Sequence, residues 1–99
     1  MEADALRLSW AAGVWEAKGY LRDRGSKGIV ARLTDTNRSL LESFADIVQD
    51  GSIYGPDLSG QFSKTPRFRF ETSRGRRIVE VLDPYLTAEG RKRFSALLP

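Results

Sequence analysis

Residues 6–19 read LRLSWAAGVWEAKG, and this stretch decides the fold. Its composition is that of a helix, but apolar or small side chains fall on every side and are interrupted before the final lysine only by Arg7, Ser9 and Glu16. A helix that is apolar all round must be buried all round. In a chain of 99 residues, one side of this helix can pack on the chain's own core. The other side therefore predicts contact with a second subunit.

Small side chains in the middle of this helix indicate where the second subunit would pack. Ala11, Ala12 and Gly13 have no bulky side chains to hold two helix axes apart. Glycine in the middle of a helix costs up to about 1 kcal/mol relative to alanine, so Gly13 needs a packing reason. We therefore predict a homodimer whose interface contains Trp10, Ala11, Ala12, Gly13 and Val14.

Two short strands are expected after Gly19, which we interpret as the cap that ends the helix. Residues 20–34 read YLRDRGSKGIVARLT, with a glycine-containing turn in the middle. Arg22 and Arg24 share one face of the first strand. The second strand presents Arg32 on the side opposite its apolar residues. Both strands thus have a basic face.

A second helix is predicted next, with Asp35 or Thr36 as its cap. Apolar residues recur at helical spacing from Leu40 to Val48. The acidic residues of its outer side are Glu42, Asp46 and Asp50. We expect them to form an ordinary solvated surface.

The clearest strand signal lies at residues 66–73, which read PRFRFETS. Phe68 and Phe70 point to one side of this strand, because side chains alternate between the two faces. The charged residues on the other side are Arg67, Arg69 and Glu71. This pattern predicts a half-buried strand with a basic outer face.

The complete order of elements predicts the fold class. A short strand at residues 52–54, a helix at 74–82 that ends before Pro84, and a last helix capped by Thr87 complete the chain. The order is then helix, strand, strand, helix, strand, strand, helix, helix. It favours an α+β fold in one domain, residues 1–99, with a four-stranded antiparallel sheet and helices on one face. The other sheet face is open.

Positive charge gathers in two blocks, although the whole chain carries only +3. Residues 19–34 have four basic side chains and one acidic, and residues 61–77 have six basic and one acidic. Because both blocks contribute strands to one sheet, the open face becomes basic, as the surface of a polyanion-binding protein is. The alternative is charge dispersed over an ordinary solvated surface. The candidate DNA contacts are Arg22, Arg24, Lys27, Arg32, Lys64, Arg67 and Arg69.

Other classes of function are excluded by what the chain lacks. It has no cysteine and no histidine, which excludes disulfide scaffolds, Cys/His zinc sites and Ser-His or Cys-His catalysis within one chain. It has no glycine-rich phosphate loop or nucleotide fingerprint, so we expect no small-molecule substrate. No apolar run reaches the roughly 20 residues that span a bilayer, and the N-terminus lacks the basic region of a secretion signal. We therefore expect a soluble, intracellular protein with no membrane partner.

Residues 11–19, AAGVWEAKG, resemble the nine-residue motif of the LAGLIDADG homing endonuclease family without a gap. Ala12, Gly13, Ala17 and Gly19 are identical to the motif. Three further stretches are similar to single-motif members of the family: GSIYG at 51–55, PRFRFE at 66–71 and VLDPYL at 81–86. The resemblance covers essentially the whole chain. The resemblance implies a homodimer that is joined through the motif helices and whose two sheets form a saddle over double-stranded DNA. It also implies that the protein is a magnesium-dependent endonuclease encoded by an intron or intein.

Lys18 departs from this resemblance at its most important position. In the family, the residue before the final glycine of the motif is a carboxylate that binds the divalent metal for phosphodiester hydrolysis. A lysine offers only hydrogen-bond donors and repels a cation. Glu16 corresponds to an earlier acid of the motif, and with the backbone carbonyl of Ala17 it is the remaining candidate for holding Mg²⁺ or another divalent cation.

Several functions therefore remain open. In the first, the chain is a divalent-metal endonuclease. In the second, it is a DNA-binding module without catalytic activity, such as a repressor or maturase-like factor. In the third, it is half of a heterodimeric nickase whose partner subunit retains the metal-binding carboxylate. If the chain does not cleave DNA, no cofactor is expected. Outside nucleic-acid binding, the alternative is an α+β dimerisation or small-ligand module.

Overall fold

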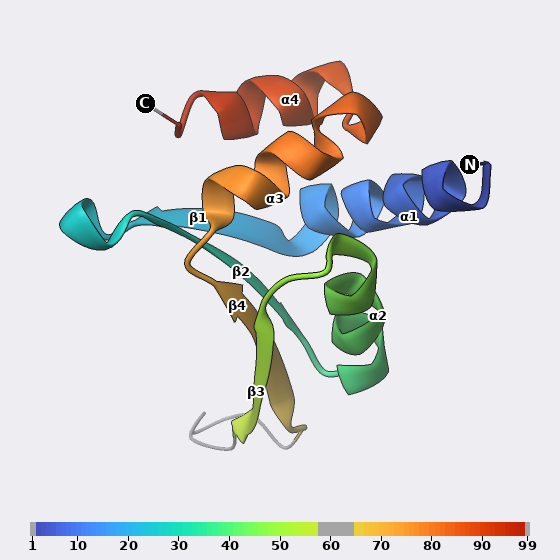
Figure 1. The fold of residues 1–99 in the computed structure, drawn as a ribbon. Helices are drawn as coiled ribbons and strands as arrows, with labels where there is room; N and C mark the ends of the chain where they lie inside the picture. Colours follow the sequence, from blue (N-terminus) through green and yellow to red (C-terminus); the bar gives the residue numbers. More distant parts are fainter. Residues whose placement is uncertain (1, 58–64, 99) are drawn as a thin grey trace.

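The computed structural model describes residues 2–57 and 65–98. Along the chain the elements are α1 (Glu2–Lys18), β1 (Gly19–Asp23), the 3₁₀ helix η1 (Gly25–Lys27), β2 (Ile29–Asp35), α2 (Arg38–Val48), β3 (Ser52–Asp57), β4 (Arg67–Thr72), α3 (Gly75–Leu82), the 3₁₀ helix η2 (Asp83–Tyr85) and α4 (Ala88–Ser95) (Figure 1). This order confirms the predicted α+β class with its αββαββαα arrangement. None of the described helices is long and apolar enough to cross a membrane.

The four strands form one antiparallel sheet in the order β1-β2-β4-β3. The sheet is strongly twisted, since its β1–β2 end points to the left in Figure 1 and its β3–β4 end points down, and the helices gather on one side of it. The register places Arg32 of β2 between Tyr20 and Glu71. It places Arg69 of β4 between Thr34 and Tyr54. These cross-strand rows decide which side chains share the face away from the helices.

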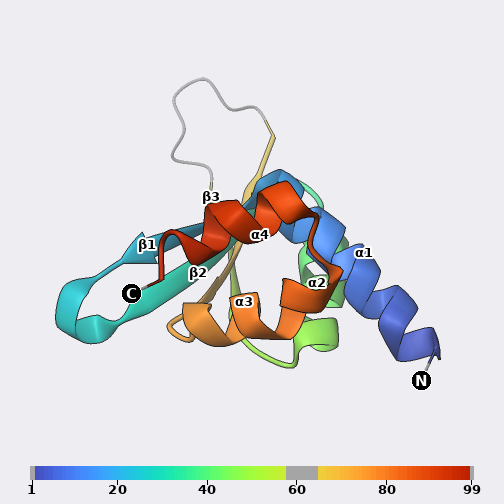
Figure 2. The same ribbon diagram turned by 90° about the horizontal axis from the view of Figure 1, so that it is seen from above.

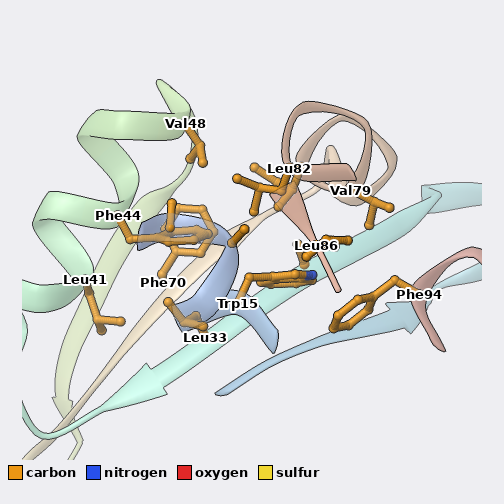
Figure 3. Close-up of a cluster of buried hydrophobic side chains, with 14 residues drawn as sticks. Trp15, Leu33, Leu41, Phe44, Val48, Phe70, Val79, Leu82, Leu86 and Phe94 are labelled. Carbon is orange, nitrogen blue, oxygen red and sulfur yellow. The ribbon is translucent and has the colours of Figure 1, made fainter. Parts of the chain in front are cut away.

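The core lies between the helices and the sheet and is centred on Trp15 of α1 (Figure 3). The Trp15 ring stacks on Phe44 of α2 with 6.3 Å between centroids, and it lies 5.1 Å from the ring of Phe94 of α4. Phe70 of β4 meets Phe44 edge-on at 5.0 Å. Gly19 begins β1 directly, and any side chain there would overlap the Trp15 ring. The helix thus ends directly before Gly19, as predicted, and the lack of a side chain at Gly19 also leaves room for Trp15.

Two details of α2 differ from the prediction. Its cap is Asn37, whose Oδ1 accepts a hydrogen bond from the backbone nitrogen of Leu40 at 3.2 Å. Asp50 does not belong to the solvated side of the helix. The helix ends at Val48, and Gln49, in the left-handed conformation with φ of 54°, turns the chain inward. The side chain of Asp50 is consequently only 1% exposed.

Buried Asp50 ties α2, β4 and α3 together. Its carboxylate accepts hydrogen bonds from Thr72 Oγ1 at 2.8 Å, from Arg74 Nη2 at 2.8 Å and from Arg77 Nη1 at 3.0 Å. Arg77 Nη1 also donates to the backbone carbonyl of Val48 at 2.9 Å. Burial alone would raise the pKa of Asp50, but the hydrogen bonds from Arg74 and Thr72 lower it to about 2. Asp50 is therefore a charged structural anchor.

Candidate nucleic-acid interface

The sheet face away from the helices carries its polar side chains in cross-strand rows. One row consists of Tyr20, Arg32, Glu71 and Ser52. The next row consists of Thr34, Arg69 and Tyr54. The alternate positions Ala31, Leu33 and Phe70 are fully buried in the core. The predicted alternation in β2 and β4 is thereby confirmed.

Two arginines in the middle of this face lie against Glu71. Arg32 Nε donates a hydrogen bond to Glu71 Oε1, and this contact raises the pKa of Arg32. Arg69 Nη2 lies 3.8 Å from Glu71 Oε2, and its guanidinium lies 5.0 Å from the centroid of the Tyr54 ring. The side chain of Arg32 is 16% exposed, whereas that of Arg69 is 40% exposed. Arg32 is thus firmly held, and Arg69 is more open to a ligand.

Three further basic residues extend this surface along the β1–β2 end of the sheet. Arg22 is exposed and is the cross-strand partner of Val30. Arg24 lines a hollow of about 370 Å³ that Val30 also lines. Lys27 is exposed in η1, at the far end of the β1–β2 arm (Figure 1). Within residues 2–57 and 65–98, no ion pair involves Arg22, Arg24 or Lys27, so all three are available to an anion.

A second hollow, of about 450 Å³, is bordered by Arg67 and by two tyrosines. Tyr20 and Tyr54 are 42% and 48% exposed, and neither was among the predicted contacts. Strand alternation was the available signal for Tyr20, which lies two residues before Arg22 in β1 and so shares its face. Lys64, the remaining predicted contact, lies outside the described residues.

Lys18, at the end of α1, is engaged within the chain. Its Nζ lies 2.6 Å from Oδ2 of Asp35 at the end of β2, and the two side chains are 45% and 11% exposed. The hydrogen bond from Lys18, followed by that from the backbone nitrogen of Asn37, lowers the pKa of Asp35. An ion pair thus occupies the position where the resembled family carries its metal-binding carboxylate. A divalent cation would have to displace the ammonium group to reach Asp35.

Glu16 is engaged at the start of α4. Its carboxylate accepts hydrogen bonds from the backbone nitrogen and the hydroxyl of Thr87 at 2.5 and 2.8 Å, and its backbone carbonyl accepts one from Arg93 at 2.6 Å. These contacts give Glu16 a structural role instead of the predicted metal-binding one. The backbone carbonyl of Ala17 alone offers a single oxygen. In the described part of this single chain, no three Asp, Glu, Cys or His side chains gather into a metal site.

The predicted dimer interface on α1 is corrected in part. The members of the predicted set that pack into the chain's own core are Ala11, Ala12 and, in part, Val14. The reason is that five consecutive residues cover more than one helical turn and cannot share a face. The opposite side exposes Leu6 by 72% and Trp10 by 42%, and among the described residues no atom outside the backbone of Gly13's own helical turns and its two neighbours lies within 4 Å of the place that a Cβ of Gly13 would take. The N-terminal half of α1 also extends past α3 in both views (Figures 1 and 2).

Comparison with known proteins identifies the fold. No protein-family model and no curated protein sequence matches the chain. The homing endonuclease I-CvuI, solved with the I-CreI target in the presence of magnesium and with the DNA not cleaved, is 18% identical with a TM-score of 0.67, over 97% of this chain and 66% of that one. I-CvuI on its own target with calcium is 18% identical with a TM-score of 0.68, over 99% and 67%. The archaeal intron-encoded homing endonuclease I-Vdi141I, complexed with DNA, is 16% identical with a TM-score of 0.64, over 89% and 62%. The chain therefore has the fold of these homing endonucleases and spans about two thirds of their length.

Proposed function

We propose that this protein binds double-stranded DNA with sequence preference, as a homodimer, and does not cleave it. The observation that carries the proposal is the open sheet face, on which arginine side chains from β1, β2 and β4 stand opposite the helices. The likeness of the fold to homing endonucleases that were solved in complex with DNA supports DNA binding.

The rows of side chains suit the major groove, which is about 12 Å wide and admits a two-stranded ribbon. Arg32 and Arg69 lie in the middle of the face, where base edges would be within reach. Arg22, Arg24 and Lys27 lie farther out, toward the phosphates that flank the groove. Contacts in the middle specify sequence, and contacts at the rim position the protein.

The exposed side of α1 supports dimerisation. Leu6 and Trp10 present apolar surface there, and Gly13 lets a second helix approach closely because it has no side chain. A contact of this patch with its own copy is two-fold symmetric. It would place two sheets side by side on one duplex, so the target is expected to be roughly palindromic.

The ion pair between Lys18 and Asp35 is the reason to expect no cleavage. Metal-assisted hydrolysis needs a ligand that holds the cation against the phosphate, where it polarises the phosphoryl oxygen and activates water. Lys18 supplies positive charge instead, which can neutralise a DNA phosphate. DNA binding should therefore not require magnesium.

A salt titration of duplex binding, followed by fluorescence anisotropy, tests the proposed surface. Arg67→Ala and Arg69→Ala should each weaken binding, and a variant that no longer neutralises one phosphate should show a slope of log affinity against log salt that is smaller by about one. Asp46→Ala is the control, because this side chain is 76% exposed on α2, behind the sheet, and its removal should change neither quantity. Unchanged affinity and unchanged slope in both arginine variants would remove β4 from the interface.

A further inference from the structure

Glu71 occupies an unexpected place for a surface that binds DNA. It lies in the middle of the open sheet face, with Arg32 as its cross-strand neighbour on one side and Ser52 on the other. Its side chain is 20% exposed, so its charge is felt at the surface. A carboxylate there lowers the affinity for every polyanion. Its presence in this position requires a separate explanation.

The contact with Glu71 fixes one edge of the Arg32 guanidinium. Nε of Arg32 donates to Oε1 of Glu71, and Tyr20 is the cross-strand neighbour of Arg32 on the other side. The terminal Nη groups keep N–H donors in the guanidinium plane for a ligand. Arg32 lines the hollow of about 450 Å³ that Tyr54 also lines, so these donors can be approached from the open side of the sheet.

We propose, on the basis of the DNA binding proposed above, that Glu71 is a positioning residue that aims Arg32 at a guanine in the major groove, once in each half of the target. Guanine presents two acceptors, O6 and N7, which match two parallel N–H donors of an arginine. Adenine presents a donor at N6 and cytosine a donor at N4, so both would meet Arg32 donor to donor.

Arg69 lies on the same face as Arg32 but has no hydrogen bond to Glu71. Its Nη2 lies 3.8 Å from Glu71, which is beyond hydrogen-bond distance. Its Nε is buried and has no hydrogen-bond partner among the residues that the structure describes. Arg69 therefore has no hydrogen bond to Glu71 that fixes its guanidinium plane, whereas Arg32 is held in one orientation by Glu71 and carries the base discrimination.

The charge of Glu71 also disfavours non-specific binding. It offsets one of the two central arginine charges, so a phosphate gains little by approaching there. Replacing Glu71 with methionine, which has a similar length but neither the charge nor the acceptor oxygen that Arg32 Nε uses, should therefore strengthen binding to random DNA while removing the preference for guanine. If Glu71 only stabilised the sheet, the same replacement would weaken both.

Selection from a randomised duplex library tests this role. The unmodified chain should prefer guanine by about 5- to 150-fold at one position in each half-site. Glu71→Met should use the four bases almost equally at that position and should bind random DNA a few fold more tightly at low salt. Arg32→Lys keeps the charge but loses the planar fork, so it should lose the preference with little change in binding to random DNA. Glu42→Met is the matched control, because it removes a carboxylate that pairs with Arg38 on α2, and it should behave as the unmodified chain does.

The possible results separate this role from the DNA binding on which it rests. A guanine preference that survives in Glu71→Met or in Arg32→Lys would overturn the positioning role and leave DNA binding in place. Weaker binding of Glu71→Met to random DNA would mark a structural contact and would also overturn it. If Glu71→Met fails to fold in a thermal melt, Arg32→Lys decides alone. A failure of the unmodified chain to bind any duplex would overturn the proposed function and this role together.

Discussion

Replacing Asp50 with asparagine should remove much of the acid sensitivity of the fold. The Asp50 side chain is 1% exposed, and its pKa is lowered from 3.8 to about 2. A carboxylate whose pKa is lower in the folded than in the unfolded chain stabilises the fold above the unfolded pKa, and this stabilisation is lost as the pH falls toward the folded pKa. The lowered pKa corresponds to about 2 kcal/mol of free energy of unfolding at neutral pH, lost between about pH 5 and pH 1.

Urea unfolding at a series of pH values from neutral to about pH 2 measures this effect. Asp50→Asn should lose about 2 kcal/mol at neutral pH and show a flatter dependence on acid, since Arg74 and Arg77 are 66% and 42% exposed and can return to water. The control is Asp46→Asn, which removes a 76% exposed partner of Arg7 and should change the free energy of unfolding by less than about 1 kcal/mol. If the stability of Asp50→Asn falls with acid as steeply as that of the unmodified chain, the reasoning is refuted.

Three further predictions concern α1. Gly13→Leu should give a folded monomer by light scattering, because the new Cβ would meet no described atom beyond its own helical turns and neighbours, so only a second subunit would be displaced. A fully dimeric variant would place Gly13 outside the interface. Lys18→Glu puts a second carboxylate beside Asp35, so it should weaken metal-free DNA binding and give magnesium-dependent cleavage in a gel assay. Lys18→Met adds no metal ligand and should give no cleavage. Cleavage by Lys18→Met would contradict the claim that the unmodified chain is inactive because it lacks a metal ligand at position 18. Glu16→Ala removes two hydrogen bonds from Thr87 and should lower the free energy of unfolding, measured by urea denaturation, by about 1 to 2 kcal/mol. The control is Glu80→Ala, which changes an exposed residue of α3. Equal stability of the two variants would contradict the conclusion that Glu16 anchors α4.

Features that depend on neighbours in the sequence were predictable. Alternation in residues 66–73 predicted the side of β4 that carries Arg67 and Arg69, because a strand sends successive side chains to opposite faces in any fold. Thr87 was predicted as the cap of α4, and its hydroxyl accepts a hydrogen bond from the backbone nitrogen of Gly90 at 3.1 Å. A cap acts within one turn, so the local sequence contains all that is needed to see it.

Contacts between distant residues were not predictable in this way. Glu16 and Thr87 are 71 positions apart, and each alone is compatible with a solvated surface. The pairing of Lys18 with Asp35 likewise depends on the end of α1 meeting the end of β2. Asp50 was predicted to be exposed because helical spacing was extended past the true end of α2. In each case the fold, and not the residue type, decides the partner.

A single selection from a randomised duplex library, run with and without magnesium and scored for bound and for cleaved molecules, tests most directly whether this chain is a DNA-binding protein without nuclease activity. We predict enrichment of the same roughly palindromic sequence in both conditions, recovered intact in each. Magnesium-dependent double-strand cutting by the unmodified chain, or binding that enriches no sequence at all, would contradict this.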